Sequence, residues 1–277
     1  MSRSLPAAPR LPLADGASIP QLGYGLYKVP AEDATALCLD AIDAGYRHLD
    51  TAAFYGNERE VGEAVRASGL PRDELFVTSK VWKDDNGYDR TLRAVDESMR
   101  RFALDRLDLF LIHWPVPSTD RYVETWRALV RLQAEGRVRS IGVSNFHVHH
   151  VDRIVAETGV APAVNQVELH PWLPQRALRE DHAARGIRVE AWSPLARGRV
   201  LDDATLAGIA AKHGRSPAQV VLRWHVEPGV IAIPKASSPA RLRENLDVFD
   251  FSLDDADAAA IASLESGTRT GRDPDLD

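Results

Sequence analysis

Four ionisable residues lie at or just past the ends of three short apolar segments, in an arrangement that suits proton transfer. Asp50 ends the first segment and Tyr55 follows it, Lys80 lies in the second, and His113 ends the third. Lys80 as an ammonium is expected to pair with Asp50 and to stabilise the phenolate of Tyr55, which would lower the pKa of the phenol from about 10. Such a phenol gives or takes a proton near neutral pH. His113 can donate a hydrogen bond to a carbonyl oxygen and orient it.

An alternative interpretation makes Asp50 and Lys80 a structural ion pair and leaves Tyr55 and His113 as ordinary rim residues. The intervals are 30 residues from Asp50 to Lys80 and 33 residues from Lys80 to His113. Each interval has the length of one strand, one helix and two loops, so adjacent units bring one chemical group each to the same edge. We therefore interpret the four residues as one site.

Polar side chains at two further segment ends could hold a planar amide. Ser144 and Asn145 end one apolar segment, and Gln166 lies in the next. Trp192 ends a later segment and offers a flat face on which an aromatic ring could stack. A tryptophan at a strand end is more often core packing, so each of these signals is weak alone.

A basic cluster marks the start of a predicted helix near the end of the chain. Lys235 ends an apolar segment, Ser238 is a natural N-cap, and Pro239 takes the first helical position. Arg241 falls in the first turn, where the helix dipole does not favour a positive charge. An anion held by Lys235, Arg241 and the free backbone donors accounts for this placement. The alternative is a solvated basic helix start.

Short apolar segments alternate with amphipathic ones along the whole chain. We predict strands at 21–29, 47–51, 75–81, 107–113, 139–144, 164–169, 188–192 and 230–234. Helical spacing of apolar residues predicts helices at 30–45, 57–68, 90–104, 121–135, 148–158, 175–185 and 217–226. This alternation favours an α/β fold, a closed (β/α)8 TIM barrel with extra helices, over an open doubly wound sheet. Active sites of such barrels lie at the carboxyl ends of the strands.

The first residues predict a β-hairpin that forms a lid on one end of the barrel. Its signal is Asp15-Gly16 between two short apolar pieces. A length of 277 residues with 44% hydrophobic content suits one large core. We predict a single domain over residues 1–277, with a flexible or extended tail at 266–277.

Composition narrows the class of partner. A net charge of -6 argues against a nucleic-acid groove. Cys38 is the single cysteine and cannot form an internal disulfide, and the first residues lack the apolar core of a signal peptide. No run approaches the roughly 18 apolar residues of a membrane helix. We expect a cytoplasmic monomer that binds a small molecule, neither nucleic acid nor membrane.

Six stretches give the chain a specific resemblance to the aldo-keto reductase superfamily, within its bacterial 2,5-diketo-D-gluconate reductase-like group. They are GYRHLDTA at 45–52, LIHWP at 111–115, IGVSNF at 141–146, NQVELHP at 165–171, IPK at 233–235 and EN at 244–245. The resemblance implies NADPH-dependent reduction of aldehydes or ketones, with hydride from the nicotinamide and a proton from Tyr55. Diketo sugar acids, methylglyoxal and keto esters are the implied substrates.

The same resemblance implies a role for each matching residue. Lys80 and Asp50 would tune the phenol, and His113 would orient the substrate. The implied substrate pocket is lined by Tyr27, Phe54, Trp82 and Trp114. The implied cofactor residues are Ser144, Asn145, Gln166, Trp192, Ser193, Leu195, Arg197, Lys235, Ser237, Ser238, Arg241, Glu244 and Asn245.

Three departures from the family pattern qualify these expectations. Trp192 stands where tyrosine is common as the stacking residue. Ala236 and Ser237 follow Lys235 where serine and valine are usual, so NADPH is expected to be preferred and NADH to serve as the weaker cofactor. The short polar tail lacks a long aromatic closing loop, which predicts an open, permissive pocket.

Two other function classes compete with this one. A metal-dependent hydrolase could use Asp50, His113 and His170, but the Lys80 ammonium beside them would repel the cation, so we predict no metal. Solvated histidines explain the cluster of His147, His149 and His150. A non-catalytic NADP(H)-binding sensor or structural protein on the same barrel is the second alternative.

Overall fold

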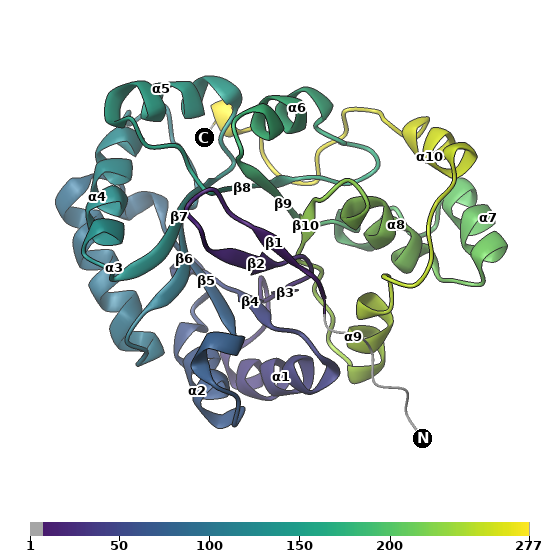
Figure 1. The fold of residues 1–277 in the computed structure, drawn as a ribbon, viewed down its shortest axis with the longest axis horizontal. Coiled ribbons are helices and arrows are strands. Elements are labelled where there is room, and N and C mark those ends of the chain that lie inside the picture. The colour runs from purple at the N-terminus through teal and green to yellow at the C-terminus, as the bar shows by residue number, and fades with distance from the viewer. Residues whose placement is uncertain (1–7, 277) are drawn as a thin grey trace.

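The computed structural model describes residues 8–276 and shows a ring of parallel strands surrounded by helices (Figure 1). The strands are β1 (Arg10–Pro12), β2 (Ser18–Pro20), β3 (Tyr24–Gly25), β4 (His48–Asp50), β5 (Phe76–Val81), β6 (Leu107–Ile112), β7 (Val138–Ser144), β8 (Val164–Glu168), β9 (Arg188–Trp192) and β10 (Ile231–Ala232). The helices are α1 (Ala31–Ala44), α2 (Glu58–Ala67), α3 (Tyr88–Phe102), α4 (Tyr122–Ala134), α5 (Val148–Thr158), α6 (Arg176–Ala184), α7 (Ala204–His213), α8 (Pro217–Val226), α9 (Pro239–Leu246) and α10 (Asp255–Ala262).

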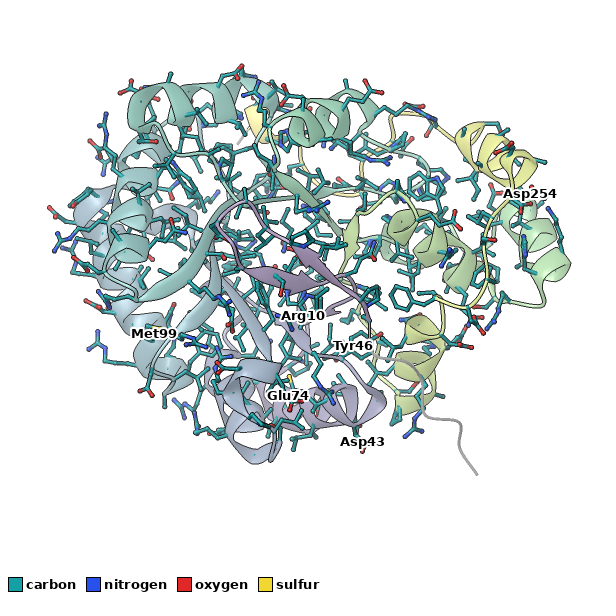
Figure 2. All side chains as sticks on the ribbon, in the orientation of Figure 1. Arg10, Asp43, Tyr46, Glu74, Met99 and Asp254 are labelled. Atoms are coloured by element: carbon teal, nitrogen blue, oxygen red, sulfur yellow. The ribbon has the colours of Figure 1, made fainter. Side chains whose placement is uncertain are left out.

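Strands β3 to β10 form one parallel sheet that closes on itself. They pair in chain order, from β3 to β10. At the seam, Gly23 N donates to Ala232 O at 2.9 Å, and Ala232 N donates to Gln21 O at 3.1 Å. These bonds join the two edges of the sheet and confirm the predicted (β/α)8 barrel. Side chains fill the space inside the ribbon (Figure 2).

The first and last strands of the barrel are shorter than predicted. The segment predicted at 21–29 is regular only over β3, and the segment predicted at 230–234 only over β10. Pro234 has no N–H to continue a ladder. A Cβ on Gly25 would lie 2.6 Å from Ile233 O, so the two strands touch here by their backbones.

The predicted hairpin lid covers the amino end of the barrel. Strands β1 and β2 pair antiparallel, and Gly16 takes a φ of +84° in the turn, where a side chain would be strained. Ile19 belongs to one buried apolar cluster with Phe76 and Ile231, which begin β5 and β10. The hairpin therefore seals the end opposite the carboxyl ends of the strands.

Two helices outside the strand–helix alternation supply the extra helices that we expected. Helices α7 and α10 pack beside α8 around a separate apolar cluster that contains Leu206, Val220 and Ile261. Lys212 Nζ at the end of α7 donates to Asp257 Oδ1 at 2.9 Å near the start of α10. Among the described residues, none of the helices is long and apolar enough to cross a lipid bilayer.

Candidate active site

Asp50 and Lys80 form a buried ion pair at the carboxyl ends of β4 and β5. Lys80 Nζ donates to Asp50 Oδ1 at 2.7 Å and to the carbonyl oxygen of Thr51 at 2.9 Å. Lys80 is fully buried and Asp50 is 2% exposed. A buried charge needs a partner and further hydrogen bonds, and Asp50 has a further one from Gln166 Nε2 at 2.8 Å, as Lys80 has one to Thr51.

Tyr55 and His113 complete the group of four predicted residues. Tyr55 ends the 3-10 helix η1 (Ala53–Tyr55) and is half-buried. The centre of its ring lies 5.2 Å from Lys80 Nζ and 5.7 Å from the centre of the His113 ring. His113 follows β6 and is 7% exposed. The structure thus brings all four residues to one mouth.

The predicted lowering of the Tyr55 pKa is wrong for this structure. Burial raises the pKa of Tyr55 well above 10, and the nearby Asp50 and Glu190 carboxyls raise it further. Together these effects outweigh the attraction of Lys80. Burial and the Lys80 charge also lower the pKa of His113 well below its usual value. At neutral pH the site therefore presents a protonated phenol beside a neutral imidazole.

The predicted amide-binding residues form a hydrogen-bonded layer beside the ion pair. Ser144 Oγ donates to the backbone carbonyl oxygen of Gln166 at 2.8 Å, and Asn145 Nδ2 donates to the backbone carbonyl oxygen of His113 at 2.9 Å. Trp192 Nε1 donates to Asn145 Oδ1 at 2.8 Å, which fixes the indole. Gln166 Nε2 donates to the carboxyl groups of Asp50 and Glu190, so its side-chain oxygen Oε1 is the atom that can accept from an incoming amide.

Glu190 is a residue of this layer that the sequence analysis missed. It lies on β9 with no solvent exposure, and its Oε2 accepts from the same Gln166 Nε2 that donates to Asp50. Burial and the Asp50 carboxylate raise the pKa of Glu190 to about 8. An acid inside an apolar strand was the available signal, because carboxylates are rarely fully buried without a partner.

The structure does not assemble the alternative metal set. Among the described residues, no group able to hold a metal contains His113 or His170. His170 Nε2 instead lies 3.1 Å from Glu168 Oε1. His48, Asp50 and Glu190 do offer close ligand atoms, but the Lys80 ammonium on Asp50 opposes a cation there.

Aromatic side chains form a wall around the mouth. Phe54 stacks on Trp82 with ring centres 3.9 Å apart, and Tyr27 lies 5.2 Å from Tyr55. Tyr27 is 43% exposed and Phe54 is 54% exposed. Trp114 is half-buried beyond His113. This wall gives the predicted substrate pocket an apolar side over a polar floor.

The loop after β9 has the backbone of a ligand-binding segment. Ser193, Ala196 and Arg197 have φ values of 47°, 47° and 58°, although none is glycine. Leu195 between them is half-buried. Left-handed conformations of this kind are strained and cluster at ligand clamps.

The predicted phosphate residues lie between β10 and the start of α9. Lys235, Ser237 and Arg241 are exposed, and Ser238 is the N-cap that accepts from Arg241 N at 3.4 Å. In the described part of the chain, neither Lys235 nor Arg241 forms an ion pair with an acidic side chain. Glu244 is half-buried and Asn245 is buried further along α9.

The tail reaches the mouth beside Trp192. Thr270 N and Gly271 N both donate to the carboxylate of Glu168 at the end of β8. A Cβ on Gly271 would lie 2.4 Å from Trp192 Cη2, so the tail touches the indole by its backbone. The open pocket stays a prediction, and this segment lies beside the part of the mouth where a substrate's outer end would emerge.

A comparison with sequence families decides the assignment. The sequence model of the aldo/keto reductase family matches residues 20–266. The chain belongs to the aldo/keto reductase family.

Known proteins similar to this aldo-keto reductase cover nearly its whole length. It is 53% identical to an aldo-keto reductase of Mycolicibacterium smegmatis, over 96% of this chain and 97% of the relative. It is 47% identical to the methylglyoxal reductase DkgA of Salmonella typhimurium, over 95% of this chain and 96% of the relative. A crystal structure of a Gox0644 mutant in complex with NADPH superposes with a TM-score of 0.94 at 48% identity, covering 98% of this chain and 99% of that one.

Proposed function

We propose that this aldo-keto reductase uses NADPH to reduce small dicarbonyl compounds, keto esters and diketo sugar acids, with Tyr55 as the proton donor. The observation that carries the proposal is the position of the Tyr55 ring, 5.2 Å from Lys80 Nζ of the buried Asp50–Lys80 pair and 5.7 Å from the His113 ring. Burial raises the pKa of that phenol well above 10, so it keeps its proton. The similarity to a protein named methylglyoxal reductase supports a dicarbonyl substrate.

The residues present fit a nicotinamide cofactor. The side-chain oxygen Oε1 of Gln166 remains available to accept from an amide, and the half-buried Trp192 is held by Asn145 at the mouth. Exposed Lys235 and Arg241 can pair with the 2'-phosphate that distinguishes NADPH from NADH. Ser193 to Arg199 would cover the pyrophosphate, and Glu244 and Asn245 would meet the adenine. When bound, NADPH supplies the hydride for the carbonyl carbon.

The chain's own residues supply orientation and the proton. The neutral His113 donates a ring N–H to the carbonyl oxygen and holds it near Tyr55. Tyr55 gives its phenolic proton to that oxygen as negative charge develops there. Lys80 then stabilises the phenolate, Asp50 balances the Lys80 charge, and solvent at the mouth returns a proton to the phenolate.

The test compares wild type, Tyr55→Phe and Tyr27→Phe with methylglyoxal and a diketo sugar acid. NADPH consumption measures turnover, and quenching of tryptophan fluorescence measures binding. Loss of the general acid should lower kcat by about 10²-fold or more in Tyr55→Phe. Binding of NADPH should be unchanged, and Tyr27→Phe, which removes a neighbouring hydroxyl, should retain turnover.

Two outcomes would contradict the proposal. Full turnover by Tyr55→Phe would show that another group is the proton donor. If wild type binds NADPH but reduces none of the carbonyls, a non-catalytic NADP(H)-binding sensor would explain the chain better than a reductase.

We also infer that the enzyme acts as a monomer, because the four central residues and every cofactor residue come from one chain. Sedimentation velocity across a range of protein concentrations tests this, and a concentration-dependent dimer with altered kcat would contradict it.

A further inference from the structure

Three histidines at the start of α5 face two aspartates of the tail. His147 precedes α5, and His149 and His150 lie in its first turn. Asp273 and Asp275 come from the last residues, and the yellow end of the ribbon lies beside α5 in Figure 1. The interpretation of these histidines as solvated is wrong for His150, whose side chain is 2% exposed, whereas His147 is half-buried at 24% and His149 is exposed at 62%.

The spacing of these side chains matches the edges of a metal coordination shell. His147 Nε2 lies 3.2 Å from Asp273 Oδ1 and 3.8 Å from Asp275 Oδ2, and His149 Nε2 lies 3.3 Å from Asp275 Oδ1. Two ligands at about 2.1 Å from a tetrahedral metal are about 3.4 Å apart. Small side-chain shifts would therefore bring these atoms onto one ion.

Asp273 and Asp275 both approach the same imidazole nitrogen of His147. His147 Nε2 carries at most one proton, yet both carboxylates approach it. Arg269 Nε lies 3.4 Å from Asp273 Oδ2, and Asp275 N donates to Asp273 Oδ1 at 3.1 Å, which holds that oxygen beside His147 Nε2. A divalent cation at this point could be coordinated by both carboxylates at once.

His150 supplies the second, independent observation. Its Nδ1 accepts from His147 N at 3.1 Å, so in the neutral ring the proton is on Nε2. That Nε2 is buried without a hydrogen-bond partner and lies 3.3 Å from Asp275 Oδ1. An N–H this close to a carboxylate can hold it as a metal ligand from outside the coordination shell once the carboxylate turns toward it.

We infer that His147, Asp273 and Asp275 bind a divalent transition metal such as Zn²⁺, with exposed His149 turning in as a fourth ligand. Imidazole and carboxylate together suit Zn²⁺, Co²⁺ or Ni²⁺ better than Mg²⁺ or Ca²⁺. The metal fastens the tail to α5, and the same tail touches Glu168 and Trp192 at the mouth. This site does not depend on the proposed function.

Binding is tested directly by calorimetric titration of the full-length protein, without an affinity tag and freed of metal by a chelator, with ZnCl₂. Wild type should bind one Zn²⁺ at this site. His147→Gln and Asp275→Asn each remove a ligand and should weaken that binding by about tenfold or more. Asp202→Asn removes an exposed aspartate elsewhere and should bind as wild type does.

Arg269→Gln distinguishes metal binding from the ion pair that helps to hold the tail. It breaks the Arg269–Asp273 ion pair but keeps every proposed ligand, so Zn²⁺ binding should persist or tighten. In the proteins that keep Arg269, the rate of trypsin cleavage after Arg269 and Arg272, followed by intact mass, measures how accessible the tail is. Zn²⁺ should slow cleavage in wild type and Asp202→Asn but not in His147→Gln.

Two results would overturn the inference. One is the absence of Zn²⁺ binding by wild type. The other is binding that His147→Gln and Asp275→Asn leave unchanged, since the ion would then be held elsewhere.

Discussion

The chemistry of the four central residues depends on how much water each has lost. Asp50 and Lys80 are buried and neutralise each other, whereas Tyr55 is half-buried at the mouth. Burial and the carboxyls of Asp50 and Glu190 keep the Tyr55 phenol protonated. A protonated phenol is an acid, so the free enzyme is prepared to reduce a carbonyl.

Carbonyl reduction should therefore be nearly independent of pH from about 6 to 7, because the raised pKa of Tyr55 keeps its donor proton and Glu190, with a pKa of about 8, also stays protonated in that range. Alcohol oxidation needs the phenolate, whose fraction rises with pH below that pKa, so its rate should increase steadily. Values of kcat/KM in both directions across this range check the prediction. A fall in reduction with an apparent pKa near neutrality would show that Lys80 dominates in the working complex.

The positions of the four residues were predictable from the sequence, whereas the direction of the Tyr55 pKa shift was not. Asp50, Lys80 and His113 end consecutive strands, so their sequence intervals alone placed them at one edge. The direction of the Tyr55 shift depends on burial and on Glu190, which reaches Asp50 across the barrel through Gln166. No local pattern in the sequence encodes that contact.

Helix contacts depend on small residues at the points of closest approach. Gly62 of α2 lies against α3 so closely that a Cβ would be 2.0 Å from the carbonyl oxygen of Phe102. Gly208 of α7 is exposed, and nothing lies within 4 Å of its Cβ position. The two glycines occupy helix interiors but have opposite surroundings.

Alanine at these two glycines should shift stability in opposite directions. Gly208→Ala should stabilise by about 0.5–1 kcal/mol, because alanine is the better helix former. Gly62→Ala should destabilise by about 1–3 kcal/mol or more, because the backbones of α2 and α3 must separate. Urea denaturation measures both. If Gly62→Ala raised the free energy of unfolding as much as Gly208→Ala, helices α2 and α3 would be able to move apart at little cost.

The start of α9 should select the cofactor. Arg241→Ala removes a charge-assisted contact worth about 1.5–3 kcal/mol, so NADPH binding should weaken by about 10–100-fold. NADH lacks the 2'-phosphate, and its binding should hardly change. Arg243→Ala removes an exposed arginine of the same helix that pairs with Asp43 instead, and is the control. Equal weakening of both cofactors in Arg241→Ala would place the phosphate elsewhere.

The elements of the barrel were largely predictable, and the misses have local causes. Strand β9 was predicted to the residue, and β4 to β8 within a residue or two at each end. The strands at the seam were overestimated because their apolar composition extends beyond the regular ladder, and β10 ends at Ala232, two residues before Pro234, which has no N–H to donate. Helices α7 and α10 lie outside the strand–helix alternation that guided the prediction.

At the scale of the whole molecule, the barrel separates stability from chemistry. The hairpin and the strand starts close the amino end, while the four central residues and the tail occupy the carboxyl end. Alternation of strands and helices was enough to predict the closed ring. The course of the tail was not predictable, because this polar segment is positioned by Glu168, Trp192 and the α5 histidines rather than by any pattern of its own.

Ile19→Ala tests this separation. Ile19 on β2 is fully buried in the apolar cluster that contains Phe76 and Leu109, so its truncation should lower the free energy of unfolding by about 2–5 kcal/mol. Leu11→Ala in the same hairpin alters a half-buried side chain and should lower it less. Urea denaturation gives these values, and kcat/KM for methylglyoxal should stay within about twofold of wild type, since sites far apart behave independently. A fall in kcat/KM that follows the loss of stability would mean that the sealed end also sets the geometry of Tyr55 and Lys80.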